Sequence, residues 1–284
     1  MAAPAVGPRA QSDDVIPTDD AYHFSAWADG RQDAFYTEWW YFNFFDARSG
    51  VQGIFSYFVT NPGDLLDGGR ARMAAVAYTG QGIVSAVDPY PRAAFSASET
   101  QADVSIGANA IQVIDADTYR VTGASRDGRL RWDLTYAREA ETWLAADRMG
   151  VGSFPWEKMS WLIYMPRARV VGRMVVDGHA YDISAPGYHD HNWGEWFPTD
   201  ALWNWGQYSD RRLSLEIGDF IGKPVGVVGV DFDGERTVFT KGQYWLLHTR
   251  WALDWKSLVW YPTESVLFAG NDTRRLWVTV RAIG

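Results

Sequence analysis

Short runs of apolar and aromatic residues, separated by turn signals, extend along most of this chain. Six of these runs are Trp39–Phe45, Ile54–Val59, Arg129–Tyr136, Met159–Met165, Val225–Phe232 and Leu276–Val280. The separators include Asp46–Gly50, Arg126–Arg129, Asp177-Gly178 and Asp233-Gly234. Asp-Gly between two β-rich runs is a strong hairpin signal. We therefore predict an antiparallel all-β fold, a barrel or a sandwich, in which Glu139–Met149 is the best candidate for a helix.

A weak internal repeat indicates two related β-units. A shift of 164 positions aligns Trp39 with Trp203, Tyr41 with Trp205, Asn43 with Gln207, Asp46 with Asp210, and Arg48 with Arg212. In both copies an aromatic strand leads into an Asp-Xaa-Arg turn and then a second apolar strand, although five matches can also arise by chance. We place the boundary near Pro186-Gly187. The predicted organisation is a loose arm over residues 1–20, an N-terminal β-domain over 21–186 and a C-terminal β-domain over 187–284.

The composition excludes several classes of protein and site. The 284 residues include no cysteine, so neither disulfides nor thiolate metal ligands are available. The 35 acidic and 26 basic residues give a formal charge of −9, which argues against nucleic acid or anionic lipid as the main partner. Because no run of about 18 apolar residues and no secretory signal pattern is present, we expect a cytoplasmic protein without a membrane span. The 16 tryptophans exceed ordinary usage and require an explanation.

The segment Thr37–Asn43 places a carboxylate among aromatic rings. Side chains alternate along a strand, so one face would carry Glu38, Trp40 and Phe42 and the other Trp39, Tyr41 and Asn43. Burial among rings raises the pKa of a carboxyl group, which makes Glu38 a candidate general acid. On residue types alone the structural alternative is favoured, in which Glu38 is ion-paired or hydrogen-bonded and the rings form core.

A second segment, Gly187–Trp196, concentrates polar side chains between glycines and aromatic rings. If it is extended, one face carries His189, His191 and Trp193, and the other carries Tyr188, Asp190 and Asn192. A His-Xaa-His pair can chelate a metal, but the other histidines lie far off in the sequence, and we predict no metal site. We prefer a His-Asp network in which Asp190 or a histidine donates or orients a proton. A buried polar network that only joins the two units fits equally well.

The motifs Glu38-Trp-Trp-Tyr41 and Tyr188-His-Asp-His-Asn-Trp-Gly194, with Leu202-Trp-Asn-Trp-Gly206, resemble a known family. It is the two-domain lipocalin-like family of carotenoid hydratases (hydroxyneurosporene synthases). AttH-like proteins, kievitone hydratase-like proteins and fungal lipocalin-type Diels–Alderases are similar. The resemblance extends from about Phe35 to the C-terminus. It implies two consecutive lipocalin-like antiparallel β-barrels or half-barrels, a ligand cavity in or between them, and no cofactor.

The resemblance also supplies candidate site residues. In the hydratases an acidic residue is expected to protonate the alkene, and that role could fall here on Asp190, Glu195 or Glu38. The catalytic candidates are Asp190, His189, His191 and Glu38. The candidate substrate-binding residues are Trp40, Tyr41, Asn43, Tyr188, Trp193 and Trp205.

The leading hypothesis is a cofactor-free enzyme that cyclises, or hydrates the double bonds of, a polyene, terpenoid or polyketide. An apolar cavity would fold the flexible substrate into a reactive shape, and a buried acid would donate a proton or a hydrogen bond. The partner is then a hydrophobic small molecule, and no oligomeric state is predicted. The alternative is a non-catalytic lipocalin-like carrier, which the fold alone does not distinguish from an enzyme. A carbohydrate-binding module is a third hypothesis, and it requires exposed aromatic rings.

Overall fold

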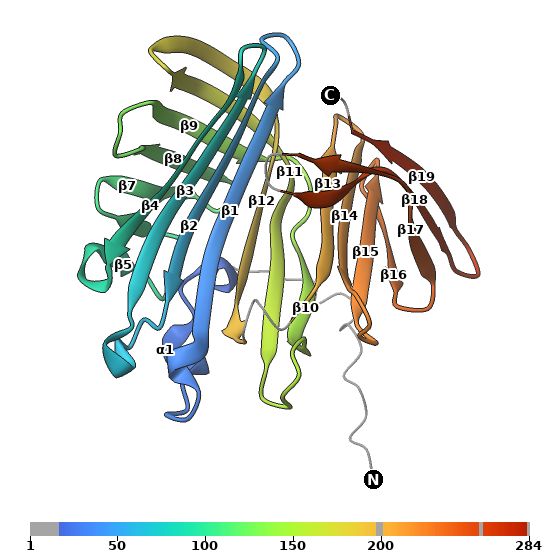
Figure 1. The fold of residues 1–284 in the computed structure, drawn as a ribbon, viewed down its shortest axis with the longest axis horizontal. Helices are drawn as coiled ribbons and strands as arrows, with labels where there is room; N and C mark the ends of the chain where they lie inside the picture. Colours follow the sequence, from blue (N-terminus) through green and yellow to red (C-terminus); the bar gives the residue numbers. More distant parts are fainter. Residues whose placement is uncertain (1–16, 197–200, 256–257, 283–284) are drawn as a thin grey trace.

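The computed structural model describes residues 17–196, 201–255 and 258–282, and these residues form three antiparallel sheets (Figure 1). The first is a 12-stranded sheet that curls around its own core. Its strands are β1 (Tyr36–Asp46), β2 (Val51–Thr60), β3 (Arg70–Thr79), β4 (Gly82–Pro91), β5 (Phe95–Ala97), β6 (Val104–Ile106), β7 (Asn109–Asp115), β8 (Thr118–Ala124), β9 (Leu130–Arg138), β10 (Trp143–Gly150), β11 (Lys158–Val176) and β12 (His179–Glu195). The all-β prediction is confirmed.

The strand order of the first sheet brings distant parts of the chain together. The order is β4-β3-β2-β1-β12-β11-β9-β8-β7-β6-β5, and β10 pairs with the first half of β11. The end strands β4 and β5 are joined by the short helix η4 (Arg92–Ala94). Inside the curl, side chains of every strand except β10 form one apolar core that includes Trp40, Phe42 and Tyr57. The long hairpin β11–β12 therefore stands beside β1, although β1 and β12 are far apart in the sequence.

Two hairpin turns lie at Asp-Gly pairs, as the sequence predicts. Asp177 and Gly178 join β11 to β12 with φ values of 48° and 82°, and Asp233 and Gly234 make the corresponding turn in the second unit at 52° and 86°. Positive φ at both central residues defines a type I′ hairpin, for which Asp-Gly is a preferred sequence. The Asp46–Gly50 segment likewise joins β1 to β2.

The second unit consists of a four-stranded and a three-stranded sheet. The four-stranded sheet contains β13 (Trp203–Ser209), β14 (Leu213–Phe220), β15 (Gly226–Phe232) and β16 (Glu235–Thr240). The three-stranded sheet contains β17 (Tyr244–Asp254), β18 (Val259–Gly270) and β19 (Arg275–Arg281). A small core that includes Leu215, Val228, Phe239 and Leu267 lies between the two sheets. Figure 1 shows the three-stranded sheet at the end of the molecule that is remote from β4 to β9.

The two units meet over a shared apolar cluster. Trp143 and Trp161 from the first sheet pack in one cluster with Phe220 and Val227 from the second. Residues that the shift of 164 positions aligns contact each other at this junction. The rings of Tyr41 and Trp205 lie 5.1 Å apart. The Gln207 side-chain amide donates to Asn43 Oδ1 at 3.2 Å.

Some expectations differ from the structure. Glu139–Met149 is not a helix, because most of it belongs to β10 and its connection, and strand pairing with β11 overrides the local preference. Residues 1–16 of the predicted arm lie outside the described residues, whereas Pro17–Asp20 forms the helical turn η1 and Asp20 is fully buried. The expected boundary at Pro186-Gly187 falls inside β12, which continues in the first sheet to Glu195. Among the described residues, no helix is long and apolar enough to cross a membrane.

Candidate functional site

The two sequence motifs lie side by side as the paired strands β1 and β12. Their register places Glu38 opposite Trp193, Trp40 opposite His191, and Tyr41 opposite Asp190. Side chains alternate along both strands, so the predicted site residues separate onto two faces of this pair. The face inside the first sheet carries Glu38, Trp40, His189, His191 and Trp193, and the face toward the second unit carries Tyr41, Asn43, Tyr188 and Asp190.

Asp20 and two histidines form the centre of a buried network on the inner face. His189 Nε2 contacts Asp20 Oδ2 at 2.9 Å, and His189 Nδ1 donates to the Tyr41 backbone carbonyl at 2.9 Å. His191 Nδ1 lies 3.2 Å from Asp20 Oδ1. Burial opposes ionisation of Asp20, but His189 and His191 outweigh it and hold the pKa of this carboxyl well below its usual value. Asp20 is therefore a carboxylate that joins the N-terminal segment to β12.

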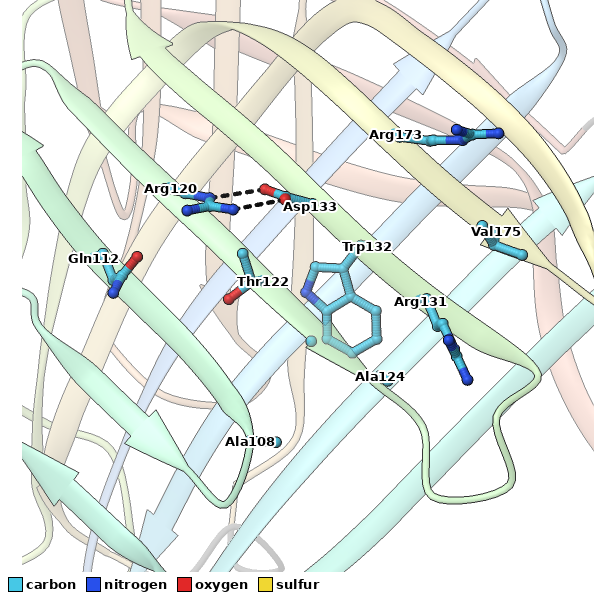
Figure 2. Close-up of a pocket in the computed structure, with 11 residues that line it drawn as sticks. Ala108, Gln112, Arg120, Thr122, Ala124, Arg131, Trp132, Asp133, Arg173 and Val175 are labelled. Carbon is cyan, nitrogen blue, oxygen red and sulfur yellow. Dashed lines mark hydrogen bonds and ion pairs between the residues drawn. The ribbon is translucent and has the colours of Figure 1, made fainter.

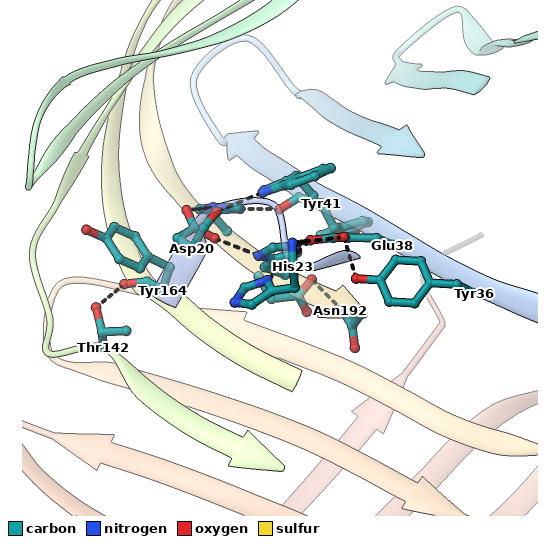
Figure 3. Close-up of polar contacts among 12 residues, drawn as sticks. Asp20, His23, Tyr36, Glu38, Tyr41, Thr142, Tyr164 and Asn192 are labelled. Atoms are coloured by element: carbon teal, nitrogen blue, oxygen red, sulfur yellow. Dashed lines mark hydrogen bonds and ion pairs between the residues drawn. The ribbon is translucent and has the colours of Figure 1, made fainter. Parts of the chain in front are cut away.

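Glu38 continues the network toward the N-terminal segment (Figure 3). His191 Nε2 contacts Glu38 Oε1 at 2.8 Å, the backbone N–H of His23 donates to the same oxygen at 3.0 Å, and the Tyr36 hydroxyl donates to Oε2 at 2.6 Å. Burial would raise the pKa of Glu38, but the hydrogen bonds from His191 and His23 lower it below its usual value. The pKa of His191 is raised, because its two carboxylate partners outweigh burial. Glu38 is thus ionised and paired, as the structural alternative predicts.

Aromatic rings fix the three imidazoles of this network. His189 stacks on Phe42 at 3.9 Å, and His23 stacks on Trp193 at 3.9 Å between ring centroids. His191 stacks on Trp40 at 4.4 Å. The indole N–H of Trp40 also donates to the Asp20 backbone carbonyl at 3.0 Å. Trp40 and Trp193 therefore hold the network in place.

Within the part of the chain that the structure describes, two groups of side chains have the geometry to hold a metal ion. His23, Glu38 and His191 present three ligand atoms within 4.8 Å of one another, and so do Asp29, Asp33 and Glu195. In the first group, Glu38 Oε1 lies 2.8 Å from His191 Nε2 and 3.2 Å from His23 Nδ1. These ligand atoms are therefore already joined to each other by hydrogen bonds. In the second group, burial and the carboxylates of Asp29 and Asp33 raise the pKa of Glu195 to about 7.

Asp190 is the buried acid on the face toward the second unit. The Trp161 indole N–H donates to Asp190 Oδ2 at 2.9 Å and the Tyr188 hydroxyl donates to it at 2.8 Å. The side-chain amide of Asn192 donates to Oδ1 at 3.3 Å. Burial raises the pKa of Asp190 to about 6, and the donors from Trp161 and Tyr188 limit that rise. Asp190 is consequently mostly ionised at pH 7 but close to its titration range.

Glu216 on β14 is a second buried acid near Asp190. It is 1% exposed, and its carboxyl oxygens make no hydrogen bond of normal geometry among the described residues, although Ser214 and Arg236 lie close enough to lower its pKa. Burial raises its pKa to about 8, so it is mostly neutral at pH 7. Burial raises the pKa of Tyr188, and the charges of Asp190 and Glu216 raise it further.

Further buried polar atoms without partners surround Glu216. Within the described part of the chain, the Trp143 indole N–H, the Ser214 hydroxyl and the Arg236 Nε–H are all unsatisfied. Arg236 lies over the Trp143 ring, and the space next to Gly229 is bounded by Trp143 and Glu216. Buried polar groups in proteins are nearly always hydrogen-bonded, so a cluster of unsatisfied groups indicates a place for water or for a ligand's polar end.

Aromatic side chains from both units surround these acids. The ring of Trp205 contacts Tyr41 at 5.1 Å and Tyr188 at 6.1 Å. Trp205 itself is 40% exposed, whereas Tyr188 is fully buried. The junction between the units therefore runs from half-exposed rings at the surface to two carboxyl groups in the interior.

A surface pocket lies away from both faces of the β1–β12 pair. A pocket of about 520 Å³ lies on the outer surface of β7, β8, β9 and β11 (Figure 2). The exposed ion pair Arg120–Asp133 lies along it, together with Arg131 and Arg173. No predicted site residue lines this pocket, and its wall is charged where the hypothesis requires an apolar one.

Three residues of these clusters were not predicted from the sequence. Asp20 lies in the segment that composition assigns to a loose arm, and His23 has no metal-ligand spacing to the other histidines. Glu216 lies between Leu215 and Ile217 in the strand Leu213–Phe220, and an acid between two apolar residues was the signal that could have identified it. Strand periodicity alone does not show which distant segments meet.

The architecture is shared with solved proteins of low sequence identity. A candidate AttH (NE1406) from Nitrosomonas europaea matches with a TM-score of 0.71 and 15% identity, over 95% of this chain and 84% of that chain. The fold is lipocalin-like. Kievitone hydratase from Nectria haematococca matches with a TM-score of 0.55 and 16% identity, over 87% of this chain and 78% of that chain.

A third solved protein agrees with this assignment of the fold. CghA, solved with Sch210972, has a TM-score of 0.50 and 12% identity, over 87% of this chain and 76% of that chain. The expected resemblance to AttH-like and kievitone hydratase-like proteins is thus confirmed at the level of the fold. No protein-family model and no curated protein matches the sequence.

Proposed function

We propose that the protein is an enzyme of small-molecule metabolism that holds a hydrophobic substrate at the junction of its two units. The observation that carries this proposal is the pair of buried acids, Asp190 and Glu216, among aromatic rings from both units. Their pKa values, about 6 and about 8, lie on either side of neutral pH. Paired groups whose environments separate their pKa values are typical of a general base and a general acid.

The two acids would have different roles in a hydration. Neutral Glu216 protonates one carbon of a substrate double bond, and the Asp190 carboxylate takes a proton from the water that adds to the other carbon. The proton gained by Asp190 then returns to Glu216, so that one water is added and both groups are restored. The faces of Trp205 and Tyr41 stabilise the developing cation by roughly 0.5–2 kcal/mol each.

A cyclisation would use the same residues, but their roles would differ. The aromatic walls would fold a polyene, terpenoid or polyketide chain into its reactive shape. Glu216 would then donate a hydrogen bond or a proton to the substrate, and Asp190 would have no water to activate. Asn43, Tyr188 and Trp205 would bind the substrate in both reactions. All these steps use side chains of this chain, so we propose no cofactor and assign the enzyme to the hydratase (hydro-lyase) or cyclase (isomerase) class.

The inner-face network has a supporting role in this proposal. His189 and Asp190 are neighbours on β12, so the Asp20–His189 contact fixes the strand on which Asp190 lies. We propose that Glu38, His189 and His191 act as positioning residues, together with Trp40 and Trp193. The likeness in fold to kievitone hydratase and to CghA supports small-molecule chemistry at this fold.

The test is conversion of hydrophobic molecules by the purified protein. Compounds that copurify with it, and a panel of linear polyenes and terpenoids, are incubated with it and analysed by mass spectrometry. A product heavier by one water indicates hydration, and an isomer with a new retention time indicates cyclisation. We expect Glu216→Gln to lower kcat about 100-fold or more in either reaction, with substrate affinity retained. Asp190→Asn should have that effect only on hydration.

The control is Glu235→Gln, because Glu235 is exposed on β16 of the same four-stranded sheet. Wild-type protein that binds a compound and returns it unchanged would support the carrier alternative instead. Unchanged turnover in Glu216→Gln would remove the acid role from that residue.

A further inference from the structure

The outer face of the three-stranded sheet displays aromatic rings to solvent. The strand register aligns Trp245 of β17, Phe268 of β18 and Trp277 of β19 in one row across the sheet. Trp245 is 62% exposed and Trp277 is 69% exposed. Leu247 follows Trp245 on the same face at 51% exposure. We call this row and its apolar neighbours Leu247 and Val266 the C-terminal aromatic face.

These rings are not needed for the core of the second unit. The alternate residues of the same strands, including Leu246, Leu267 and Val278, point to the other side and pack against β14 and β15. Exposed apolar residues scattered singly are ordinary, but a contiguous apolar patch indicates an interaction surface.

Arginines stand at both ends of the C-terminal aromatic face. Arg275 lies two residues before Trp277 on β19, so both point to the same side of the sheet. At the other end, Arg250 and Arg281 both contact the single carboxylate of Glu264. Two arginines that share one acid leave a net positive charge, so the aromatic row lies between cationic groups.

The charge of this region is opposite to that of the whole chain. Residues 244–281 contain five basic and three acidic residues, a net charge of +2, whereas the whole chain carries −9. The remaining residues therefore carry −11. We expected no anionic lipid partner from the net charge of the whole chain. That expectation does not apply to this face, because its own net charge is positive.

The end of the β17–β18 hairpin extends the exposed aromatic surface. Trp251, Trp255 and Trp260 are 51, 80 and 63% exposed, and Leu258 in the turn is 70% exposed. Tryptophan favours the boundary between lipid headgroups and acyl chains, because its ring is apolar and its N–H can still be hydrogen-bonded. Arginine binds phosphate oxygens through its planar guanidinium.

From these observations we infer that the C-terminal aromatic face and the exposed tryptophans Trp251, Trp255 and Trp260 form a docking surface for a bilayer that contains anionic phospholipid. The tryptophans lie at the headgroup level, and Arg250, Arg275 and Arg281 contact the phosphates. The acidic remainder of the protein is repelled from such a surface, so the molecule binds in one orientation. This docking is independent of the proposed function and could hold with or without catalysis.

Vesicle flotation of the full-length protein tests this inference. The probes are phosphatidylcholine vesicles with and without phosphatidylglycerol, at low and at physiological salt. We expect wild-type protein to float with the mixed vesicles and to bind less as salt increases. The double variant Trp245→Ser/Trp277→Ser should reduce the partition coefficient about tenfold or more. Arg275→Gln should reduce it about fivefold on mixed vesicles and have little effect on neutral ones.

The matched control is Ile83→Ser/Val87→Ser, because both residues are 65% exposed on β4 of the first sheet. Circular dichroism checks that each variant is folded. Absence of flotation of wild-type protein, or equal binding by the Trp245/Trp277 variant and the control, would overturn the inference. Equal binding to neutral and mixed vesicles would overturn the anionic-lipid assignment. A dimer in light scattering that the Trp245/Trp277 variant abolishes, without vesicle binding, would show that the face binds a second copy of the chain instead.

Discussion

Hydrogen-bond donors distinguish the two buried acids at the junction. Asp190 accepts from Trp161, Tyr188 and Asn192, whereas Glu216 makes no hydrogen bond of normal geometry among the residues that the structure describes, and Ser214 and Arg236 lower its pKa by less than burial raises it. Donors stabilise a carboxylate and lower its pKa, while burial alone favours the neutral acid. Similar burial thus produces a nearly ionised group and a nearly neutral one, which is the difference that an acid–base pair requires.

Glu216 should make stability fall as pH rises. Its pKa is raised from 4.5 to about 8, so between these values the folded protein keeps a proton that the unfolded chain releases. The free energy of unfolding therefore decreases with pH through this window, with a slope of about 1.4 kcal/mol per pH unit for one proton. We expect Glu216→Gln to remove this contribution, so that the variant gains stability relative to wild type from pH 5 to pH 8. Urea unfolding at a series of pH values measures it.

Glu235→Gln is the control for this titration, because Glu235 is exposed. Asp190, with a pKa of about 6, also makes the free energy of unfolding decrease as pH rises, by a smaller amount. Glu216→Gln and Glu235→Gln both retain this contribution. A constant difference in stability between Glu216→Gln and wild type across the range would contradict the prediction.

At the scale of elements, the sequence predicts strands well and strand partners poorly. Alternation along Thr37–Asn43 and Gly187–Trp196 correctly predicts which side chains share a face, since each strand has one apolar environment on each side. The pairing of β1 with β12 is a long-range contact, and local periodicity contains no information about it. The same limit explains why the candidate residues separate into two sites, and why Asp20, which approaches β12 from the N-terminal segment, was not predicted.

Asp20 should anchor the N-terminal segment to β12 through its contacts with His189 and His191. Asp20→Asn removes the carboxylate that faces His189 and His191, so His189 loses its carboxylate partner and His191 keeps only Glu38. Loss of one partner of a buried pair costs about 3 kcal/mol or more, which urea unfolding at pH 7 measures. The pKa of Asp20 is lowered on folding, so its contribution is present above the unfolded pKa of about 4 and lost as pH falls below it. Asp20 also raises the pKa of His191, so the stability difference should in addition become smaller as pH rises through that raised pKa.

The control for Asp20→Asn is Asp67→Asn. Asp67 is exposed and has φ of 51°, a left-handed conformation that asparagine also tolerates. If the two variants differ by less than about 0.5 kcal/mol, the network does not anchor the segment.

At the scale of the molecule, the two units are packed together. The tryptophans Trp143 and Trp161, which lie on the first sheet, fill spaces that glycines leave on the second sheet. A Cβ at Gly218 would lie 2.5 Å from the Trp161 ring, and one at Gly229 would lie 2.3 Å from the Trp143 ring. Part of the tryptophan excess therefore forms the contact between the units, beside the rings that surround the acids and those on the C-terminal aromatic face.

This close fit predicts a single cooperative unfolding transition that one methyl group can disturb. Gly218→Ala should lower the free energy of unfolding by about 1–3 kcal/mol, because its methyl group forces the Trp161 ring and the second sheet apart. Gly206→Ala, on the paired strand β13, is the matched control, since the nearest atom to its Cβ is 4.0 Å away. Calorimetry should show one transition in wild type and in Gly206→Ala, and a lower or divided transition in Gly218→Ala. Equal stability of the two variants would mean that the units are not coupled through this contact.

The Trp161 indole also donates to Asp190, so Gly218→Ala should change the pH dependence of turnover, whereas Gly206→Ala should not.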